Sequence, residues 1–298
     1  MNNRVAMVTG AAQGIGKGIA AALATEEFRV AVADLNLTAA EQTAKEITAA
    51  GGVAIAVEID VTRTASVESA VRAVEAALGP VEVVVNNAGW DDFMPFVQTT
   101  EEFWDKILDI NFKGALRVIK TVVPGMMGRG FGRVINIGSD AGRVGSSLEA
   151  VYSGAKGGII AFTKTLAREV AAKGVTANTV CPGPTDTPAL RSFAEGSGDA
   201  EKVIAGMVRA VPMKRLGAPE DIDELKQQNA LLEQHLADLR LQLDERDQDL
   251  AAARSANREL MAQLFVGVPE DERAAMVGGT LGDLLGFKAP LAATSSPN

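Results

Sequence analysis

The sequence predicts an α/β fold, namely a Rossmann-like, doubly wound parallel sheet followed by a C-terminal coiled-coil helix. Three observations support this prediction. Short apolar runs alternate with stretches of helical periodicity over residues 1–222, which is the pattern of successive right-handed βαβ units. A glycine-rich turn follows the first apolar run. Leucines at seven-residue spacing then dominate residues 223–264, as in a coiled coil.

Length and composition narrow the class of protein. A chain of 298 residues with 47% apolar residues can form one large domain with an appendage. The formal charge of −9 argues against binding to nucleic acid or to anionic lipid. No apolar run is long enough to span a membrane, and the N-terminus leaves no room for a signal peptide.

The rare residue types are also informative. One cysteine, Cys181, fits a reducing compartment, so we expect a cytoplasmic protein. The single histidine, His235, lies in the predicted coiled coil. This position excludes a Ser-His-Asp triad and a multi-histidine metal site from the main domain, and we expect no metal.

Six apolar runs are predicted to be strands, over residues 4–9, 29–33, 53–59, 81–85, 133–137 and 175–180. The main predicted helices cover residues 19–25, 66–78, 102–127 and 151–173, with a break at Pro124. In such a sheet, ligands bind at the carboxyl ends of the strands. Residues 188–216 are rich in Ala, Gly and Ser without a strong period, and are predicted to be a mobile lid over the substrate.

A turn with Gly10, Gly14 and Gly16 joins the first predicted strand to a helix. It allows close approach of a phosphate, and the helix N-terminus favours a pyrophosphate. Its Gly-x-x-x-Gly-x-Gly spacing differs from the commonest dinucleotide fingerprint. Asp34 ends the second strand, where a carboxylate can bind the adenosine ribose and repel a 2′-phosphate. An N-cap role for Asp34 is the alternative. Since Lys17 could reach such a phosphate, the sequence favours NAD over NADP without settling the choice.

A phenol, an ammonium group and a hydroxyl group are predicted to converge at the edge of the sheet. Tyr152, the only tyrosine, and Lys156 are four residues apart, so they share one helix face. Ser139 follows a predicted strand. The alternative is an ordinary helix start with a solvated lysine.

Motifs in the correct order resemble the short-chain dehydrogenase/reductase family over residues 1–222. They are Thr9-Gly10-x-x-x-Gly14-x-Gly16, Asp60-Val61, Asn86-Asn87-Ala88-Gly89, Asn111, Ser139, Tyr152-x-x-x-Lys156 and Pro182-Gly183-x-x-x-Thr187. Within that family, residues 86–96, 139–152 and 181–187 resemble 2-hydroxycyclohexanecarboxyl-CoA dehydrogenases. The remainder of the chain resembles an unrelated coiled coil.

The resemblance implies four catalytic residues. Tyr152 would be the general acid or base, with Lys156 lowering its pKa from about 10 and binding the nicotinamide ribose. Ser139 would donate a hydrogen bond to the substrate oxygen. Asn111 would bind a water molecule that links Lys156 to solvent, at a kink in its helix. A capping or buried structural amide is the alternative for Asn111.

The resemblance also implies a set of residues that bind the cofactor. They are Gly10, Gln13, Gly14, Ile15, Gly16, Asp34, Asp60, Val61, Asn87, Ala88, Gly89, Tyr152, Lys156, Pro182, Gly183, Thr185 and Thr187. The expected substrate contacts are Ser139, Trp90, Arg143 and Tyr152.

For each residue near the expected substrate site, an ordinary structural role is the alternative to a role in binding substrate. Trp90, together with Phe93 and Phe96, either contacts an apolar substrate or packs on the core. Arg143 either meets a CoA phosphate or is an ordinary surface arginine. The acids at 91 and 92 are expected to lie in a solvated loop rather than to bind a metal.

We therefore expect an NAD-dependent oxidoreductase acting on a secondary alcohol or ketone. A hydroxyacyl-CoA such as 2-hydroxycyclohexanecarboxyl-CoA is the narrower expectation for the substrate. One alternative is a 3-oxoacyl-carrier-protein reductase. Another is a catalytically impaired fusion whose coiled coil mediates dimerisation or binds a partner.

The C-terminal part departs from the family after Ile222. Leucines share two heptad positions, and Asn229 and Asn257 fall in the same register, which favours a parallel dimer over a single solvated helix. The family's seventh strand is missing from the sequence, so residues 175–180 would form an exposed sheet edge. We expect a homo-oligomer, with the usual family tetramer in doubt. Residues 265–298 are predicted to form a short helix and a flexible tail.

Overall fold

The computed structural model describes residues 3–196, 199–219 and 221, together with positions 246, 248, 250, 251, 255 and 256. The chain divides into two units, residues 1–228 and 229–298, and every element named below belongs to the first. Apart from those six positions, the predicted coiled coil at 223–264 lies outside the described residues. The predicted short helix and tail at 265–298 also lie outside them.

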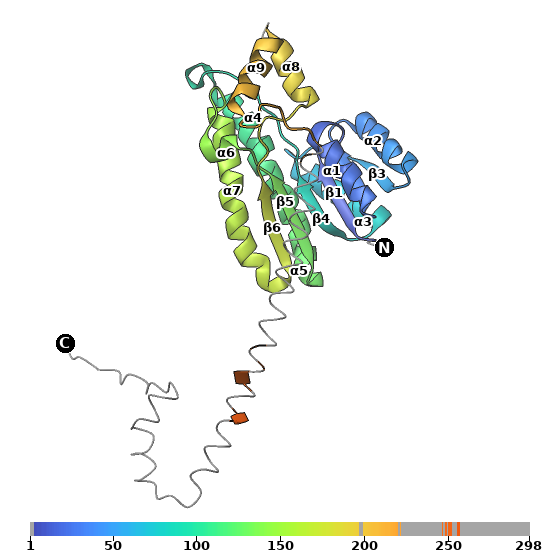
Figure 1. Cartoon of the computed structure of the whole chain (residues 1–298). Coiled ribbons are helices and arrows are strands. Elements are labelled where there is room, and N and C mark those ends of the chain that lie inside the picture. Colours follow the sequence, from blue (N-terminus) through green and yellow to red (C-terminus); the bar gives the residue numbers. More distant parts are fainter. Residues whose placement is uncertain are drawn as a thin grey trace, which may run out of the picture. The chain divides into compact units, whose positions relative to one another are not determined.

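Six parallel strands form one sheet in the order β3-β2-β1-β4-β5-β6 (Figure 1). Their bounds are β1 Val5–Thr9, β2 Arg29–Asp34, β3 Val53–Glu58, β4 Val81–Asn86, β5 Gly132–Ile137 and β6 Val175–Val180. The structure confirms the predicted doubly wound α/β fold. The strand order reverses between β1 and β4, and ligands of such sheets bind at this switch point, beyond the carboxyl ends of the strands.

Helices connect the strands. Their bounds are α1 Gly14–Thr25, α2 Leu37–Ala49, α3 Thr64–Leu78, α4 Glu101–Leu108, α5 Gly114–Arg129, α6 Ala141–Val144, α7 Ala150–Val170, α8 Pro188–Gly196 and α9 Ala200–Ala210. Short 3₁₀ turns occur at Phe96–Gln98 and Ala171–Lys173, and a π-helical turn at Asp109–Lys113 lies between α4 and α5.

The helices bury both faces of the sheet. On one face, α1 and α2 contribute buried residues such as Ile19 and Ile47 to the core. On the other face, α3, α5 and α7 contribute residues such as Val67, Val118 and Leu166. Because both faces are covered, the strands β1, β2 and β4 are largely apolar rather than alternating, whereas the edge strand β6 carries Thr176, Asn178 and Thr179. This is why the inner strands stand out in the sequence as short apolar runs.

The predicted break at Pro124 is wrong. Pro124 lies inside α5, although it cannot donate a backbone hydrogen bond. Its neighbours Val122, Val123 and Met126 are buried, so packing against the core maintains the helix. The long helical segment is interrupted instead at the π-helical turn that contains Asn111. The kink expected at Asn111 is therefore confirmed.

Residues 188–216 are more regular than the sequence indicates, because they contain α8 and α9. The Asp199 side chain caps α9 by accepting a hydrogen bond from the Lys202 amide, at 3.2 Å. No described residue of α9 is buried. The sequence analysis did not predict this helix, although its apolar residues recur at helical spacing.

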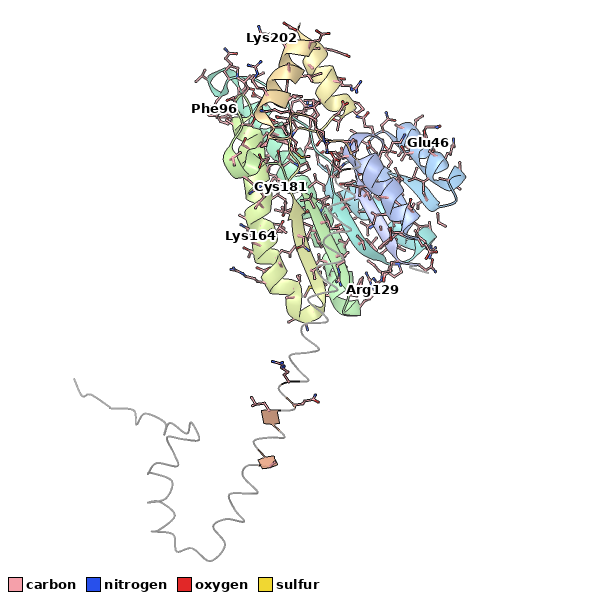
Figure 2. All side chains as sticks on the ribbon, in the orientation of Figure 1. Glu46, Phe96, Arg129, Lys164, Cys181 and Lys202 are labelled. Atoms are coloured by element: carbon pink, nitrogen blue, oxygen red, sulfur yellow. The ribbon has the colours of Figure 1, made fainter. Side chains whose placement is uncertain are left out.

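The two ends of the sheet differ in what surrounds them. At the amino end, Arg129 of α5 donates a hydrogen bond to the carbonyl oxygen of Val81, at 2.7 Å. Figure 2 shows Arg129 at this end and Phe96 and Lys202 at the opposite end, with α8 and α9. The loops that carry the predicted site residues lie at that opposite, carboxyl end.

Candidate active site

The glycine-rich turn between β1 and α1 is shaped by glycines. Gly10 and Gly14 have positive φ angles of 63° and 57°, which favour glycine. A Cβ atom on Gly16 would overlap the carbonyl oxygen of Gly10 and the side-chain amide of Asn87. The turn therefore presents bare backbone at the N-terminus of α1. This cradle fits the pyrophosphate of a dinucleotide.

The segment after β4 is locked onto this turn. The side-chain amide nitrogen of Asn87 donates to the carbonyl oxygens of Thr9 and Gly10, at 3.1 and 2.9 Å. The Thr9 hydroxyl oxygen accepts from the backbone amides of Asn87 and Ala88, both at 3.1 Å. These four bonds join the carboxyl ends of β1 and β4 at the switch point.

Asp34 lies beside the glycine-rich turn. Its carboxylate accepts hydrogen bonds from the backbone amides of Ala12, at 3.0 Å, and Asn36, at 2.9 Å. Asn36, not Asp34, caps α2, so the N-cap alternative for Asp34 is wrong. The Lys17 ammonium is paired with Glu46 at 2.6 Å, and this pairing competes with any phosphate for its charge.

The other predicted cofactor residues line the same edge of the sheet. The Asp60 carboxylate follows β3 and accepts two hydrogen bonds from Thr62, at 2.9 and 2.6 Å, which lower its pKa. Thr187 lies 3.6 Å from the position that a Cβ on Gly14 would take. The loop after β6 therefore reaches the glycine-rich turn. The remaining predicted positions in these loops are Gln13, Ile15, Val61, Gly89, Pro182, Gly183 and Thr185.

Lys156 is buried rather than solvated. Only 4% of the residue is exposed. Its ammonium group donates to the carbonyl oxygen of Ile137 at 2.8 Å, and lies 5.5 Å from the centroid of the Tyr152 ring. Burial lowers the pKa of Lys156 to about 8. The alternative of a solvated lysine at a helix start is therefore wrong.

The structure brings Ser139, Tyr152 and Lys156 together at the carboxyl end of the sheet. The Ser139 hydroxyl group lies close enough to the Tyr152 hydroxyl group to lower the pKa of Tyr152. The Ser139 hydroxyl oxygen also accepts from the backbone amide of Ala141, at 3.1 Å. This arrangement places a phenol and a hydroxyl group where they can both reach one substrate oxygen.

The ionisation of Tyr152 differs from the expectation. The sequence predicted a lowered pKa, but the structure raises the pKa of Tyr152 above its ordinary value. Burial is the largest cause, followed by the negative charges of Asp91 and Glu149, while the hydrogen bond with Ser139 acts in the opposite direction. The phenol is therefore strongly favoured over the phenolate in this geometry.

Asn111 supports the loop that leads to the site. Its side-chain nitrogen donates to the carbonyl oxygens of Trp90, at 2.6 Å, and Ile107, at 3.0 Å. Its side-chain oxygen accepts from the Trp90 amide at 3.2 Å. The residue is 3% exposed. The structure thus shows the buried structural amide that was the alternative for this position.

Two residues that were expected to contact the substrate, Trp90 and Arg143, contact other parts of the protein. The Trp90 ring packs edge-on against Phe103, with centroids 5.9 Å apart, and the Lys106 ammonium lies 3.3 Å from its centroid. Trp90 therefore packs on α4. Arg143 is exposed on α6, with 3.5 Å between its guanidinium and the Asp140 carboxylate.

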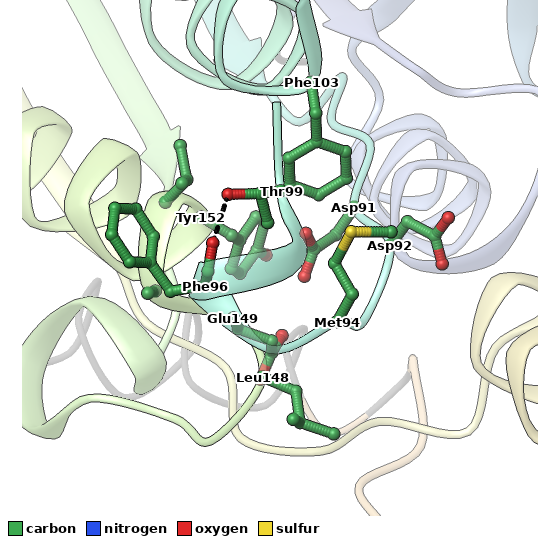
Figure 3. A pocket seen from close by; sticks show the side chains of 11 residues that line it. Asp91, Asp92, Met94, Phe96, Thr99, Phe103, Leu148, Glu149 and Tyr152 are labelled. Atoms are coloured by element: carbon green, nitrogen blue, oxygen red, sulfur yellow. Dashed lines mark hydrogen bonds between the residues drawn. The ribbon is translucent and has the colours of Figure 1, made fainter. Parts of the chain in front are cut away.

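A small pocket adjoins Tyr152 (Figure 3). It is lined by Asp91, Asp92, Met94, Phe96, Thr99, Phe103, Leu148, Glu149, Ala150, Val151 and Tyr152, and the space between these side chains is too narrow to admit a water molecule. Most of the lining is apolar, with an acidic part at Asp91 and Glu149.

The acids of this pocket were missed by the sequence analysis. The expectation of a solvated loop is wrong for Asp91, whose two carboxylate oxygens are buried, although Asp92 is exposed. Burial and the neighbouring Glu149 raise the pKa of Asp91 to about 8. No sequence pattern marks this pair, because its members come from separate loops.

A buried polar chain fixes α7 against the sheet. The side chain of Asn86 on β4 donates to Asn136 on β5, and Asn136 donates to the Thr163 hydroxyl on α7, both at 2.8 Å. All three residues are buried. Because α7 also carries Tyr152 and Lys156, this chain helps to set their position. The sequence analysis gave no role to Asn136 or Thr163.

The fold and the glycine-rich turn define the class of doubly wound, dinucleotide-binding domains. A profile of the short chain dehydrogenase family matches residues 4–198. The chain belongs to the short-chain dehydrogenase family, and it is a short-chain oxidoreductase. The resemblance stated from the sequence motifs is confirmed at the level of the family.

Three similar proteins illustrate the family. Galactitol 2-dehydrogenase of Agrobacterium fabrum is 37% identical, over 76% of this chain and 89% of the relative. Acetoacetyl-CoA reductase of Cupriavidus necator is 39% identical, over 74% of this chain and 88% of the relative. A crystal structure of an actinorhodin polyketide ketoreductase variant with NADPH has a TM-score of 0.72 and 37% identity, over 76% of this chain and 89% of that one.

Two further features were searched for in the described part of the chain. It contains no group of three or more His, Cys, Asp or Glu side chains that could bind a metal ion. It also contains no helix with the length and apolar character that crossing a bilayer requires.

Proposed function

We propose that this chain is an NAD-dependent dehydrogenase that interconverts a secondary alcohol and its ketone. The observation that carries this proposal is the convergence of Ser139, Tyr152 and buried Lys156 at the end of the sheet that also bears the glycine-rich turn. A proton-transferring group, a hydrogen-bond donor and a cation are what carbonyl reduction requires around the reacting oxygen.

The residues present fit a nicotinamide dinucleotide. The bare backbone of the turn, closed to any side chain at Gly16, would bind the pyrophosphate. Asp34 would accept hydrogen bonds from the adenosine ribose hydroxyls. Thr187, beside Gly14, would contact the nicotinamide carboxamide, and Lys156 would bind the nicotinamide ribose. When bound, the cofactor supplies or accepts the hydride.

In ketone reduction, Tyr152 would donate its phenolic proton to the carbonyl oxygen as negative charge develops there. Ser139 would donate a hydrogen bond to the same oxygen. The raised pKa of Tyr152 supports this direction, because it maintains the protonated acid. In alcohol oxidation the same atoms act in reverse, and Lys156 would stabilise the phenolate. Asn111, whose side chain is bonded to Trp90 and Ile107, would support the return path of the proton to solvent through the loop that it holds.

For the substrate we propose a hydroxyacyl-CoA or the corresponding ketone, such as 2-hydroxycyclohexanecarboxyl-CoA. The apolar side chains of Met94, Phe103 and Leu148 lie beside Tyr152, and they would have to move apart to contact an alicyclic or acyl group. Exposed Arg143 is available to a CoA phosphate. The similarity to an acetoacetyl-CoA reductase supports the same substrate class.

Hydride transfer can be followed directly as loss of NADH absorbance with a panel of ketones. The panel would contain acetoacetyl-CoA, 2-ketocyclohexanecarboxyl-CoA, a 3-oxoacyl carrier protein and a ketose. We expect turnover with a CoA thioester. Turnover confined to the carrier protein would favour the carrier-protein reductase alternative. Absence of NADH oxidation with every ketone, in a chain that binds NADH, would contradict the proposal.

Cofactor choice can be tested in the same assay. We expect kcat/KM to be about tenfold or more higher with NADH than with NADPH, because the Asp34 carboxylate repels a 2′-phosphate. A tenfold preference corresponds to a difference in free energy of about 1.4 kcal/mol. In Asp34→Ala this preference should narrow, mainly through a lower KM for NADPH. Preference for NADPH in the unaltered chain would overturn the assignment of NAD.

Self-association is part of the same proposal. The heptad leucines between residues 225 and 264, with asparagines in register, support a parallel coiled-coil dimer. Such a dimer would join two dehydrogenase domains. The single cysteine and the proposed chemistry favour a location in the cytoplasm.

A further inference from the structure

The carboxyl groups of Asp91 and Glu149 meet in the pocket beside Tyr152 (Figure 3). Asp91 lies in the loop after β4, and Glu149 immediately precedes α7. We propose that these two carboxyl groups share one proton and act as positioning residues that control the ionisation of Tyr152. The inference rests on the proposed function of Tyr152 as the proton-transferring group.

The burial of Asp91 requires a shared proton. Both of its carboxylate oxygens are buried without a well-formed hydrogen bond among the described residues, although the nearby backbone amide of Asp92 lowers the pKa of Asp91. The group within hydrogen-bonding reach is the Glu149 carboxyl group. Two carboxylates can form a hydrogen bond only when one of them carries a proton. Two unprotonated carboxylates in this position would repel each other out of water.

The surrounding charges do not neutralise the pair. Asp92, on the same loop, is exposed and adds a further negative charge. Lys156, on α7, remains largely charged near neutral pH, because burial lowers its pKa only to about 8, and the negative charge of Asp91 acts in the opposite direction on that pKa. Burial and Glu149 raise the pKa of Asp91, also to about 8. The pair therefore still holds a proton near neutral pH, although Lys156 is charged.

The proton on the pair affects Tyr152. Below about pH 8, Asp91 is protonated, so there is less negative charge near the Tyr152 phenol than when Asp91 is ionised. As the pH rises through that value, Asp91 ionises, and its charge opposes the loss of the Tyr152 proton. Tyr152 thus remains a competent acid to higher pH than it would without the pair. The pair consequently favours ketone reduction over alcohol oxidation in alkaline conditions.

The test uses the full-length chain and the fact that Tyr152 is its only tyrosine. Ultraviolet absorbance of the phenolate during a pH titration therefore reports on this residue alone. In Asp91→Asn the midpoint should fall by about one pH unit or more, because a nearby negative charge is removed. Glu149→Gln should also lower the midpoint. The control Asp92→Asn, which alters an exposed acid of the same loop, should leave it unchanged.

Kinetics supply a second readout. In Asp91→Asn, the fall of ketone reduction with rising pH and the rise of alcohol oxidation should both move to lower pH. A purely structural role would change the height of these profiles without moving them. Equal midpoints in the unaltered chain, Asp91→Asn and Glu149→Gln would overturn the inference. A shifted midpoint in a chain that transfers no hydride would support the charge coupling and contradict the proposed function instead.

Discussion

Replacing Tyr152 with phenylalanine should lower kcat by about a hundredfold to ten-thousandfold, which is the usual contribution of a general acid or base. The substitution removes the hydroxyl group that lies close to Ser139 and preserves the ring near Lys156. NADH binding should persist, because the glycine-rich turn is untouched. Turnover by rapid mixing and NADH affinity by fluorescence titration measure the two properties separately.

The neighbouring residue offers a matched control. Ser153 is on the same helix, and its hydroxyl group is buried without a hydrogen-bond partner among the described residues. Ser153→Ala should therefore leave both turnover and NADH affinity close to those of the unaltered chain. Undiminished turnover in Tyr152→Phe would show that another group transfers the proton.

Gly16→Ala should weaken NADH binding by about tenfold or more, a loss of about 1.4 kcal/mol or more. The added Cβ atom would overlap the Gly10 carbonyl oxygen and the Asn87 side-chain amide, so the turn must move. Overpacking of this kind also costs about 1–3 kcal/mol of folding stability. Isothermal titration with NADH and chemical denaturation measure the two effects.

Gly128→Ala is the control for the effect of an added methyl group. Gly128 lies in α5, and a Cβ atom there has no neighbour within 4 Å among the described residues. This variant should bind NADH normally and gain about 0.5–1 kcal/mol of stability from the better helix propensity. Normal NADH binding by Gly16→Ala would mean that the turn is not the pyrophosphate site.

Much of the fold could be predicted because the strands are short and the inner ones are largely apolar and buried. The strands at 29–34 and 175–180, for example, were located to within one residue. The failures were local. Pro124 remained helical because its buried neighbours pack against the core, and α9 was not predicted although its apolar residues recur at helical spacing.

The site was predictable where its residues follow a fixed spacing. Tyr152 and Lys156 share one turn of α7, and Ser139 follows β5, so topology alone brings them to one edge. The charge environment of Tyr152 could not be predicted, because Asp91 and Glu149 come from separate loops whose contact depends on the folded structure. The same applies to Asn136, whose polar contacts with β4 and α7 lie in an otherwise apolar strand.

A crystal structure of the full chain with NAD⁺ bound tests the central claim most directly. The account predicts the pyrophosphate on the backbone of the glycine-rich turn and the nicotinamide ring facing the Tyr152 hydroxyl group, with Lys156 bound to the adjacent ribose. A nicotinamide ring bound far from both Tyr152 and Ser139 would contradict it.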